Sequence, residues 1–219
     1  ADIEPDTLCL DPLDAARKVT PRTRAIIPVH VAGRCADMPR INGLAERFSL
    51  AVVEDAAHAW GSQLDSRGAG TLGKCGTFSF QVSKNITAGE GGIVVTNDEE
   101  LADLCRSFSH CGRTKTGAWY DHDQLGSNLR LTEFQAAILL AQRARLPAQI
   151  ARRERAAAQL TDALRDISCL RPQAPAPHMQ RRSHHLFILR VNEEELGLPR
   201  DRFIEALQAE GVPATAGWY

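Results

Sequence analysis

The chain has 219 residues, 43% of them hydrophobic, and a formal net charge of -1. A chain of this size can bury a large core, and its balanced charge argues against a general attraction to nucleic acid or to an anionic membrane. No apolar run approaches the roughly 18 residues of a membrane span and no signal peptide is visible, so we expect a soluble, cytoplasmic protein. The six cysteines form no CxxC pair, which favours reduced structural thiols, and no metal site is expected.

Both ends of the chain have the character of interior sequence. It begins with Ala1 in place of an initiator methionine and stops at Tyr219 without a polar tail. We therefore expect a fragment truncated at both ends, with exposed apolar surface where the missing parts would dock.

The first half of the chain alternates strand and helix patterns. The predicted elements, in chain order, are a short helix at 13–18, a strand at 24–31, a helix at 37–48, a strand at 50–54, a loop at 61–76, and strands at 77–80 and 91–96. The strand, helix, strand rhythm predicts a parallel βαβ unit, whose ligand cleft lies beyond the carboxyl ends of the strands. Asp55 follows such an end.

The middle of the chain is predicted to be mainly helical. Asn97 is expected to cap a helix that ends near Phe108, with Leu101 and Leu104 facing inward. The segment 110–127 has no apolar period and has the size and composition of an active-site or interface loop. A long helix follows at 131–165, which Pro147 is expected to kink or divide. Its arginine-rich face is interrupted by acidic residues and contains no aromatics, which favours a solvated face over a nucleic-acid site.

A proline-rich linker at 171–183 is predicted to separate two domains. Residues 1–170 would form a large domain, and residues 184–219 would begin a smaller α/β domain, with a strand at 184–191 and a helix at 200–210.

A lysine, Lys84, lies between an apolar run and the glycine-rich turn at 89–92. A lone lysine is most often a surface charge, but a buried lysine with a depressed pKa can form an imine with an aldehyde such as pyridoxal phosphate. That cofactor needs a carboxylate at its ring nitrogen and donors around its phosphate. Asp55 suits the first need, Ser79 the second, and His58 is placed to lie against the ring or hydrogen-bond to it.

Three long segments, 54–61, 78–92 and 126–137, together resemble the DegT/DnrJ/EryC1/StrS family of pyridoxal-phosphate aminotransferases, in the family order. The resemblance implies a type I fold, with a large α/β domain around a mostly parallel sheet and a small C-terminal α/β domain. It also implies that Lys84 is the Schiff-base lysine, Asp55 the partner of the pyridine nitrogen, His58 a group at the ring or its 3-hydroxyl, and Ser79 a phosphate ligand. Asn128 would bind the phosphate in the neighbouring subunit's site, which implies a homodimer with shared sites.

The resemblance to the cyclitol branch of the family implies amino transfer from glutamine or glutamate to a keto-cyclitol in aminoglycoside-type biosynthesis. The alternatives are transfer to a nucleotide-linked keto sugar, a catalytically silent relative, and a lysine-dependent enzyme without cofactor. In the family's dehydratases a histidine replaces the lysine, so Lys84 favours amino transfer. Arg130 is open between an interface anchor and a contact to an anionic group.

Overall fold

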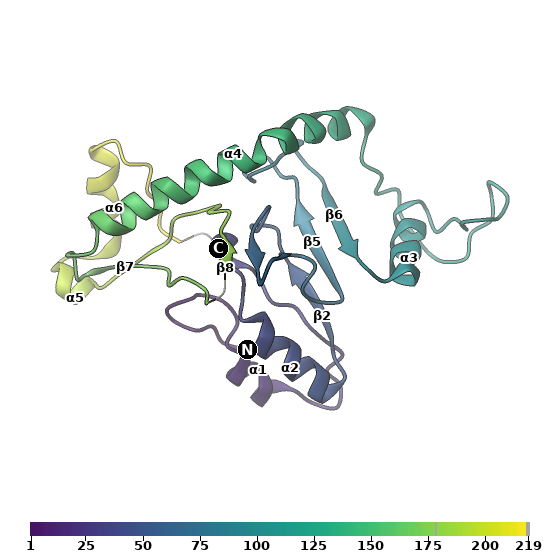
Figure 1. Ribbon diagram of the computed structural model, residues 1–219, viewed down its shortest axis with the longest axis horizontal. Coiled ribbons are helices and arrows are strands. Elements are labelled where there is room, and N and C mark those ends of the chain that lie inside the picture. The colour runs from purple at the N-terminus through teal and green to yellow at the C-terminus, as the bar shows by residue number, and fades with distance from the viewer. Residues whose placement is uncertain (178, 218–219) are drawn as a thin grey trace.

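The computed structural model describes residues 1–177 and 179–217 (Figure 1). Its central sheet has four strands in the order β1-β2-β5-β6. These strands are β1 (Ala25–Ile26), β2 (Ala51–Asp55), β5 (Cys75–Ser79) and β6 (Gly92–Thr96). The first three are parallel and β6 runs antiparallel to β5, so the carboxyl ends of β2 and β5 meet at one edge of the sheet.

Helix α2 (Met38–Phe48) connects β1 to β2 and confirms the predicted βαβ unit. Asp37 caps it, because its side chain accepts a hydrogen bond from Arg40 N. The sequence of α2 places five apolar residues on one helical face, and four of them are buried, namely Met38, Ile41, Leu44 and Ala45. The fifth, Phe48, is 38% exposed at the helix end. Helix α1 (Pro12–Lys18) packs beside α2.

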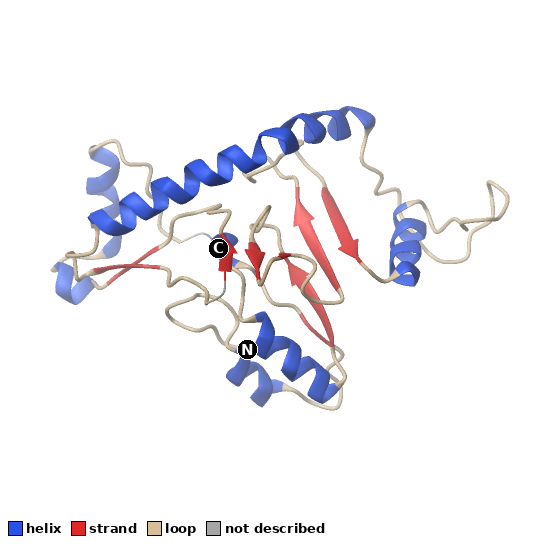
Figure 2. Cartoon of the chain, in the orientation of Figure 1, coloured by secondary structure: helices blue, strands red, loops and turns tan. Residues whose placement is uncertain are grey.

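Helix α4 (Glu133–Ala163) is the longest element and runs across one end of the sheet (Figures 1 and 2). It begins at a capping box in which Thr132 and Gln135 satisfy each other's backbone N–H groups. Pro147 lies inside the helix without dividing it. The helix therefore reaches from the β5–β6 connection to the C-terminal part of the chain.

Several predicted elements before α4 have different bounds in the structure. The strand expected at 24–31 shrinks to β1, because only Val29 continues the pairing, through an isolated bridge to Asp55. The loop expected at 61–76 contains a small hairpin, β3 (Gln63–Leu64) and β4 (Arg67–Gly68).

Helix α3 (Glu99–Ser109) also differs from its prediction. Asp98, and not Asn97, is its cap, since the Asp98 side chain accepts from Leu101 N. Leu104 is 56% exposed, so its predicted inward orientation was wrong. An aspartate and an asparagine are both good caps, and the sequence pattern alone did not choose between the two positions.

The C-terminal part contains short elements: β7 (Leu170–Pro172), β8 (Met179–Arg181), β9 (Leu189–Val191), α5 (Glu193–Leu196) and α6 (Arg200–Ala209). Strand β7 pairs with β9, and β8 pairs with β3 of residues 1–170, which we call the large unit. The predicted strand at 184–191 is wrong over its first half, because His184 has a φ of 44°, which breaks an extended chain. Residue 178 of the predicted linker and residues 218–219 of the predicted small domain lie outside the described residues, and the division into domains stays a prediction.

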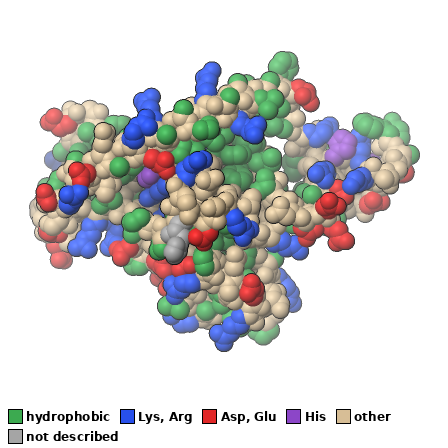
Figure 3. Space-filling view, in the orientation of Figure 1, with side chains coloured by type: hydrophobic (Ala, Val, Ile, Leu, Met, Phe, Trp, Pro, Cys, Tyr) green, Lys and Arg blue, Asp and Glu red, His purple; other side chains and the backbone are tan. Residues whose placement is uncertain are grey.

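An apolar face of the molecule is exposed beside β6. Ile93 and Val94 are 44% and 46% exposed. They line a cavity of about 900 Å³ together with residues of α3 and Leu131. Figure 3 shows the hydrophobic side chains gathered beneath the N-terminal half of α4. In the described part of the chain, no helix combines the length and the apolar character that a membrane crossing requires.

Candidate active site

The end of β2 carries two carboxylates that face opposite ways. Glu54 and Asp55 are neighbours on one strand, and successive strand residues point to opposite faces. Glu54 is fully buried, whereas Asp55 is only partly buried at the sheet edge. Glu54 therefore belongs to the core, whereas the carboxylate of Asp55 remains accessible to a ligand.

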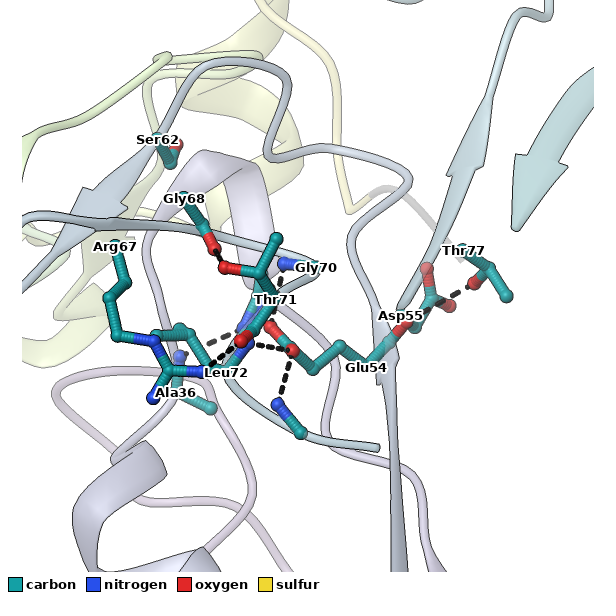
Figure 4. A network of polar contacts seen from close by, with 12 residues as sticks. Ala36, Glu54, Asp55, Ser62, Arg67, Gly68, Gly70, Thr71, Leu72 and Thr77 are labelled. Atoms are coloured by element: carbon teal, nitrogen blue, oxygen red, sulfur yellow. Dashed lines mark hydrogen bonds and ion pairs between the residues drawn. The ribbon is translucent and has the colours of Figure 1, made fainter. Parts of the chain in front are cut away.

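Glu54 accepts four hydrogen bonds inside the core (Figure 4). Backbone N–H groups of Gly70, Leu72 and Gly73 donate to it at 2.7, 2.5 and 2.6 Å. The ring of His30 is the fourth donor, at 2.8 Å. Its Nδ1 accepts from the Ala36 backbone N–H at 3.1 Å, so Nε2 carries the hydrogen that bonds Glu54.

This network keeps Glu54 ionised. Burial alone would raise the pKa of Glu54, but the hydrogen bonds from His30, Gly73 and Gly70 outweigh it, so the pKa is lowered. The carboxylate ties the end of β2 to the 70–73 loop and to the segment before α2. His30 is fully buried, and both of its ring nitrogens are hydrogen-bonded. Sequence reasoning gave Glu54 no role.

Asp55 is held in place by the backbone of the 28–30 segment, which continues β1. Its N–H donates to Pro28 O at 2.9 Å, and its own carbonyl accepts from His30 N at 3.0 Å. Its carboxylate accepts from Ala57 N at 3.0 Å, which begins the turn that leads to His58. The predicted partner of the ring nitrogen thus lies at a rigid position on the edge of a parallel sheet.

Ser79 ends β5, the strand next to β2. Its hydroxyl accepts from Gln81 N at 3.1 Å and so opens the turn toward Lys84. The Trp60 indole N–H donates to the Ser79 carbonyl at 2.9 Å, and its ring lies against Phe78 and Phe80, with centroids 4.3 and 5.3 Å away. Trp60 therefore fixes the strand end that carries Ser79.

Lys84 lies in the turn between β5 and β6, and α4 holds that turn. Lys84 N donates to Gln81 O at 3.0 Å. The Gln142 side chain bonds both the N–H and the carbonyl of Thr87, at 3.1 and 2.7 Å. About two turns earlier on the same helix, the Gln135 side chain donates to Glu90 O at 2.9 Å. Of the two glutamines, only Gln142 lies outside the three segments that carry the family resemblance.

The charges of Lys84, Asp55 and His58 interact. Burial lowers the pKa of Lys84, and the charge of Asp55 opposes that shift. Burial and the charge of Lys84 lower the pKa of His58 to about 4, again against Asp55. His58 is therefore neutral near pH 7, and Lys84 is closer to its reactive neutral form than an exposed lysine. The structure brings together the predicted Lys84, Asp55 and His58, with Ser79 on the adjoining strand end.

A second histidine belongs to this cluster and was missed in the sequence. The ring of His185 lies 4.3 Å from the ring of His58, centroid to centroid. Burial and the charges of His58, Lys84 and Arg153 lower the pKa of His185 to about 4. The sequence showed only a His184-His185 doublet, and nothing in it indicated that a residue a hundred positions from Lys84 would pack beside it.

Asn128 lies apart from this cluster. It is exposed, forms an isolated bridge with His110, and its side chain accepts from Arg130 N at 3.5 Å. Arg130 donates to the His110 ring at 2.8 Å, so it contacts its own 110–127 loop. That loop exposes large side chains: Trp119 at 64% and Tyr120 at 82%.

Several known proteins are similar to this chain in sequence and fold. The putative L-glutamine:3-amino-2,3-dideoxy-scyllo-inosose aminotransferase of Streptoalloteichus tenebrarius is 40% identical over 216 residues, covering 96% of this chain and 51% of that protein. The crystal structure of 3-amino-5-hydroxybenzoic acid synthase superposes with a TM-score of 0.91 and 37% identity, over 99% of this chain and 57% of that one. GDP-4-keto-6-deoxy-D-mannose-3-dehydratase from E. coli, with bound hydrated PLP, has a TM-score of 0.88 and 26% identity, over 96% and 57%.

The fold prediction is thereby confirmed, and the chain spans about half the length of the relatives it matches. The model of the DegT/DnrJ/EryC1/StrS aminotransferase family matches residues 1–219, all of the sequence. Lys84, Asp55 and His58 interact electrostatically, and their individual roles stay predictions. The chain belongs to the DegT/DnrJ/EryC1/StrS aminotransferase family.

Proposed function

We propose that this protein is a pyridoxal-phosphate-dependent aminotransferase that moves an amino group from glutamine or glutamate to a keto-cyclitol. The observation that carries the proposal is that Lys84 interacts with Asp55 and with the neutral His58, and that burial lowers the pKa of Lys84. The identity to a putative glutamine:inosose aminotransferase supports the choice of donor and acceptor. The six free cysteines support a reducing, cytoplasmic location.

The donor set fits pyridoxal phosphate. When bound, that cofactor supplies an electron sink for the carbon that gives up its proton. Lys84 would hold the cofactor's carbonyl carbon through its Nζ, and Asp55 would keep a proton on the ring nitrogen. Ser79 would donate its hydroxyl to the phosphate, and His58 would lie at the ring or its 3-hydroxyl.

Lys84 has a second task in this proposal. Once an amino donor has displaced it, its Nζ is free to take a proton from one carbon and return it to another, which is general base and acid catalysis by one group. A lowered pKa suits this work, because a neutral amine is needed to take the proton. His58 does not compete for the proton, because its pKa of about 4 makes it a weak base. Asp55 would be engaged at the ring nitrogen.

The acceptor is tested by comparing two substrate classes with the same enzyme. With glutamine as donor, we expect kcat/KM for amino transfer to a keto-cyclitol to exceed that for a nucleotide-linked keto sugar by at least about tenfold. A site whose polar groups bond the hydroxyls of one acceptor discriminates against another acceptor that leaves those polar groups unpaired. Faster reaction with the sugar nucleotide would overturn the cyclitol assignment and retain the transferase.

We also propose a homodimer in which Asn128 completes the partner's site. The exposed position of Asn128 and of the aromatic side chains on the 110–127 loop supports this. We expect Lys84→Ala and Asn128→Asp variants to be inactive separately, since the first lacks the amine and the second repels the phosphate. Mixed in equal amounts under conditions that exchange subunits, they would form heterodimers with one intact site, and about a quarter of the wild-type activity would return. No recovery in a mixture that mass spectrometry shows to contain heterodimers would contradict shared sites.

A further inference from the structure

Hydrogen bonds hold the segment 183–185 against the large unit, close to Lys84. The Ser183 hydroxyl donates to the carbonyl of His58 at 2.9 Å, and Ser183 N donates to the Ser62 hydroxyl at 3.1 Å. His185 N donates to Ala32 O at 3.1 Å. Ser183 is fully buried.

A glycine makes this close approach possible. Gly33 has a φ of 88°, and a Cβ there would lie 2.3 Å from the Ser183 hydroxyl. Only glycine combines that backbone conformation with the available space. The 183–185 segment is therefore seated against the chain that carries His58.

Asn85, the residue after Lys84, connects the lysine turn to this segment. It is buried, and its Nδ2 donates to the Ser183 carbonyl at 2.9 Å. Because a carbonyl oxygen can only accept, this bond fixes which end of the amide faces Ser183. The other end, Oδ1, faces Nδ1 of His185 at 3.4 Å.

The orientation of Asn85 decides where the hydrogen of His185 lies. An amide oxygen can only accept, so Nδ1 must carry the hydrogen. The ring holds one hydrogen near pH 7, because burial and the charges of His58, Lys84 and Arg153 lower its pKa to about 4. Nε2 is then left as an acceptor.

We propose that Asn85 is a positioning residue that fixes the Nδ1–H form of His185, so that Nε2 can accept a hydrogen bond from a hydroxyl or ammonium group of the substrate. The identity of the substrate rests on the proposed function, whereas the state of the ring rests on the Asn85 contacts and on the burial of His185. Asn85 acts through His185 and touches no reacting atom itself.

The state of the ring is tested by nitrogen NMR on protein with ¹⁵N-labelled histidine and without cofactor, the His185 signals being assigned with His185→Gln. We expect the Nδ1–H form in the wild type and loss of that preference in Asn85→Ala. In Asn85→Asp the carboxylate keeps an oxygen toward Nδ1 and adds a negative charge, so the Nδ1 hydrogen should remain and the pKa of His185 should rise. An Nε2–H form in the wild type, or an unchanged His185 signal in both variants, would overturn the proposal.

Kinetics provide the second readout. We expect Asn85→Ala to raise KM for the acceptor about tenfold, the cost of one weakened hydrogen bond, with the cofactor still bound at Lys84. Asn42→Ala is the matched control, since Asn42 also donates to a backbone carbonyl, that of Leu72, but from α2. Its KM should not change, and an equal rise in both variants would reduce Asn85 to a structural role. If the wild type did not bind the cofactor, the proposed function would be contradicted. The NMR experiment is done without cofactor, so it would still test the state of the His185 ring.

Discussion

Replacing Lys84 by alanine is expected to lower amino transfer by roughly 10³-fold or more, because one change removes both the covalent attachment point and the proton-transferring amine. The structure surrounds Lys84 with groups that suit these tasks. Burial lowers its pKa, Asp55 is close enough to oppose that shift, and His58 is neutral. Cofactor should still bind through the remaining contacts, but without the visible absorption of the lysine-bound form.

Lys74→Ala is the matched control for this experiment. Lys74 is an exposed lysine ten residues earlier, paired with Asp98 at 3.6 Å. Its removal should leave activity and absorption near wild-type levels. Retention of most of the activity in Lys84→Ala would show that another group carries the reaction.

The second large effect concerns stability. Glu54→Gln is expected to reduce the free energy of unfolding by about 3 kcal/mol or more, because it leaves buried N–H donors unpaired at about 1–3 kcal/mol each. The Glu54 carboxylate receives four donors and is fully buried. A glutamine would turn an NH₂ group toward some of those N–H groups, leaving donors unpaired in the core.

The same residue predicts a pH dependence. The folded-state pKa of Glu54 is lowered, below the roughly 4.3 of an unfolded glutamate. The unfolded chain therefore binds more protons, so this stabilisation is complete above the unfolded pKa and is lost as the pH falls through the folded pKa. Urea unfolding between pH 7 and pH 3 should show the loss in the wild type and a flatter curve in Glu54→Gln. Glu46 lies on the exposed side of α2, so Glu46→Gln should lose stability at low pH as the wild type does. An equal loss of stability at low pH in Glu54→Gln would contradict the role of Glu54.

The centre of the site was predictable because its residues follow strand ends. Apolar runs before Asp55 and before Lys84 indicated buried strands, and parallel strands bring their carboxyl ends to one edge. The structure confirms that β2 and β5 are parallel neighbours, and the family match confirms the resemblance carried by the three motifs. The individual roles of Asp55, His58, Ser79, Lys84 and Asn128 stay predictions.

The supporting residues were not predictable, because their partners are distant in sequence. Glu54 bonds Gly70 and His30, and Ser183 bonds His58, contacts that no local pattern encodes. His185 had the further difficulty that its segment reads as a strand, which would have placed the doublet on opposite faces. The positive φ of His184 breaks that strand, and the contacts of Ser183 and His185 with the large unit accompany the break.

The proposed function depends most directly on which amine binds the cofactor. The protein would be incubated with pyridoxal phosphate, treated with borohydride to make the linkage permanent, and digested for peptide mass mapping. We expect the added mass on the peptide that contains Lys84 and none above background on the peptides that contain Lys74 or Lys115, two exposed lysines. Labelling spread evenly over these lysines, or absent from Lys84, would contradict it.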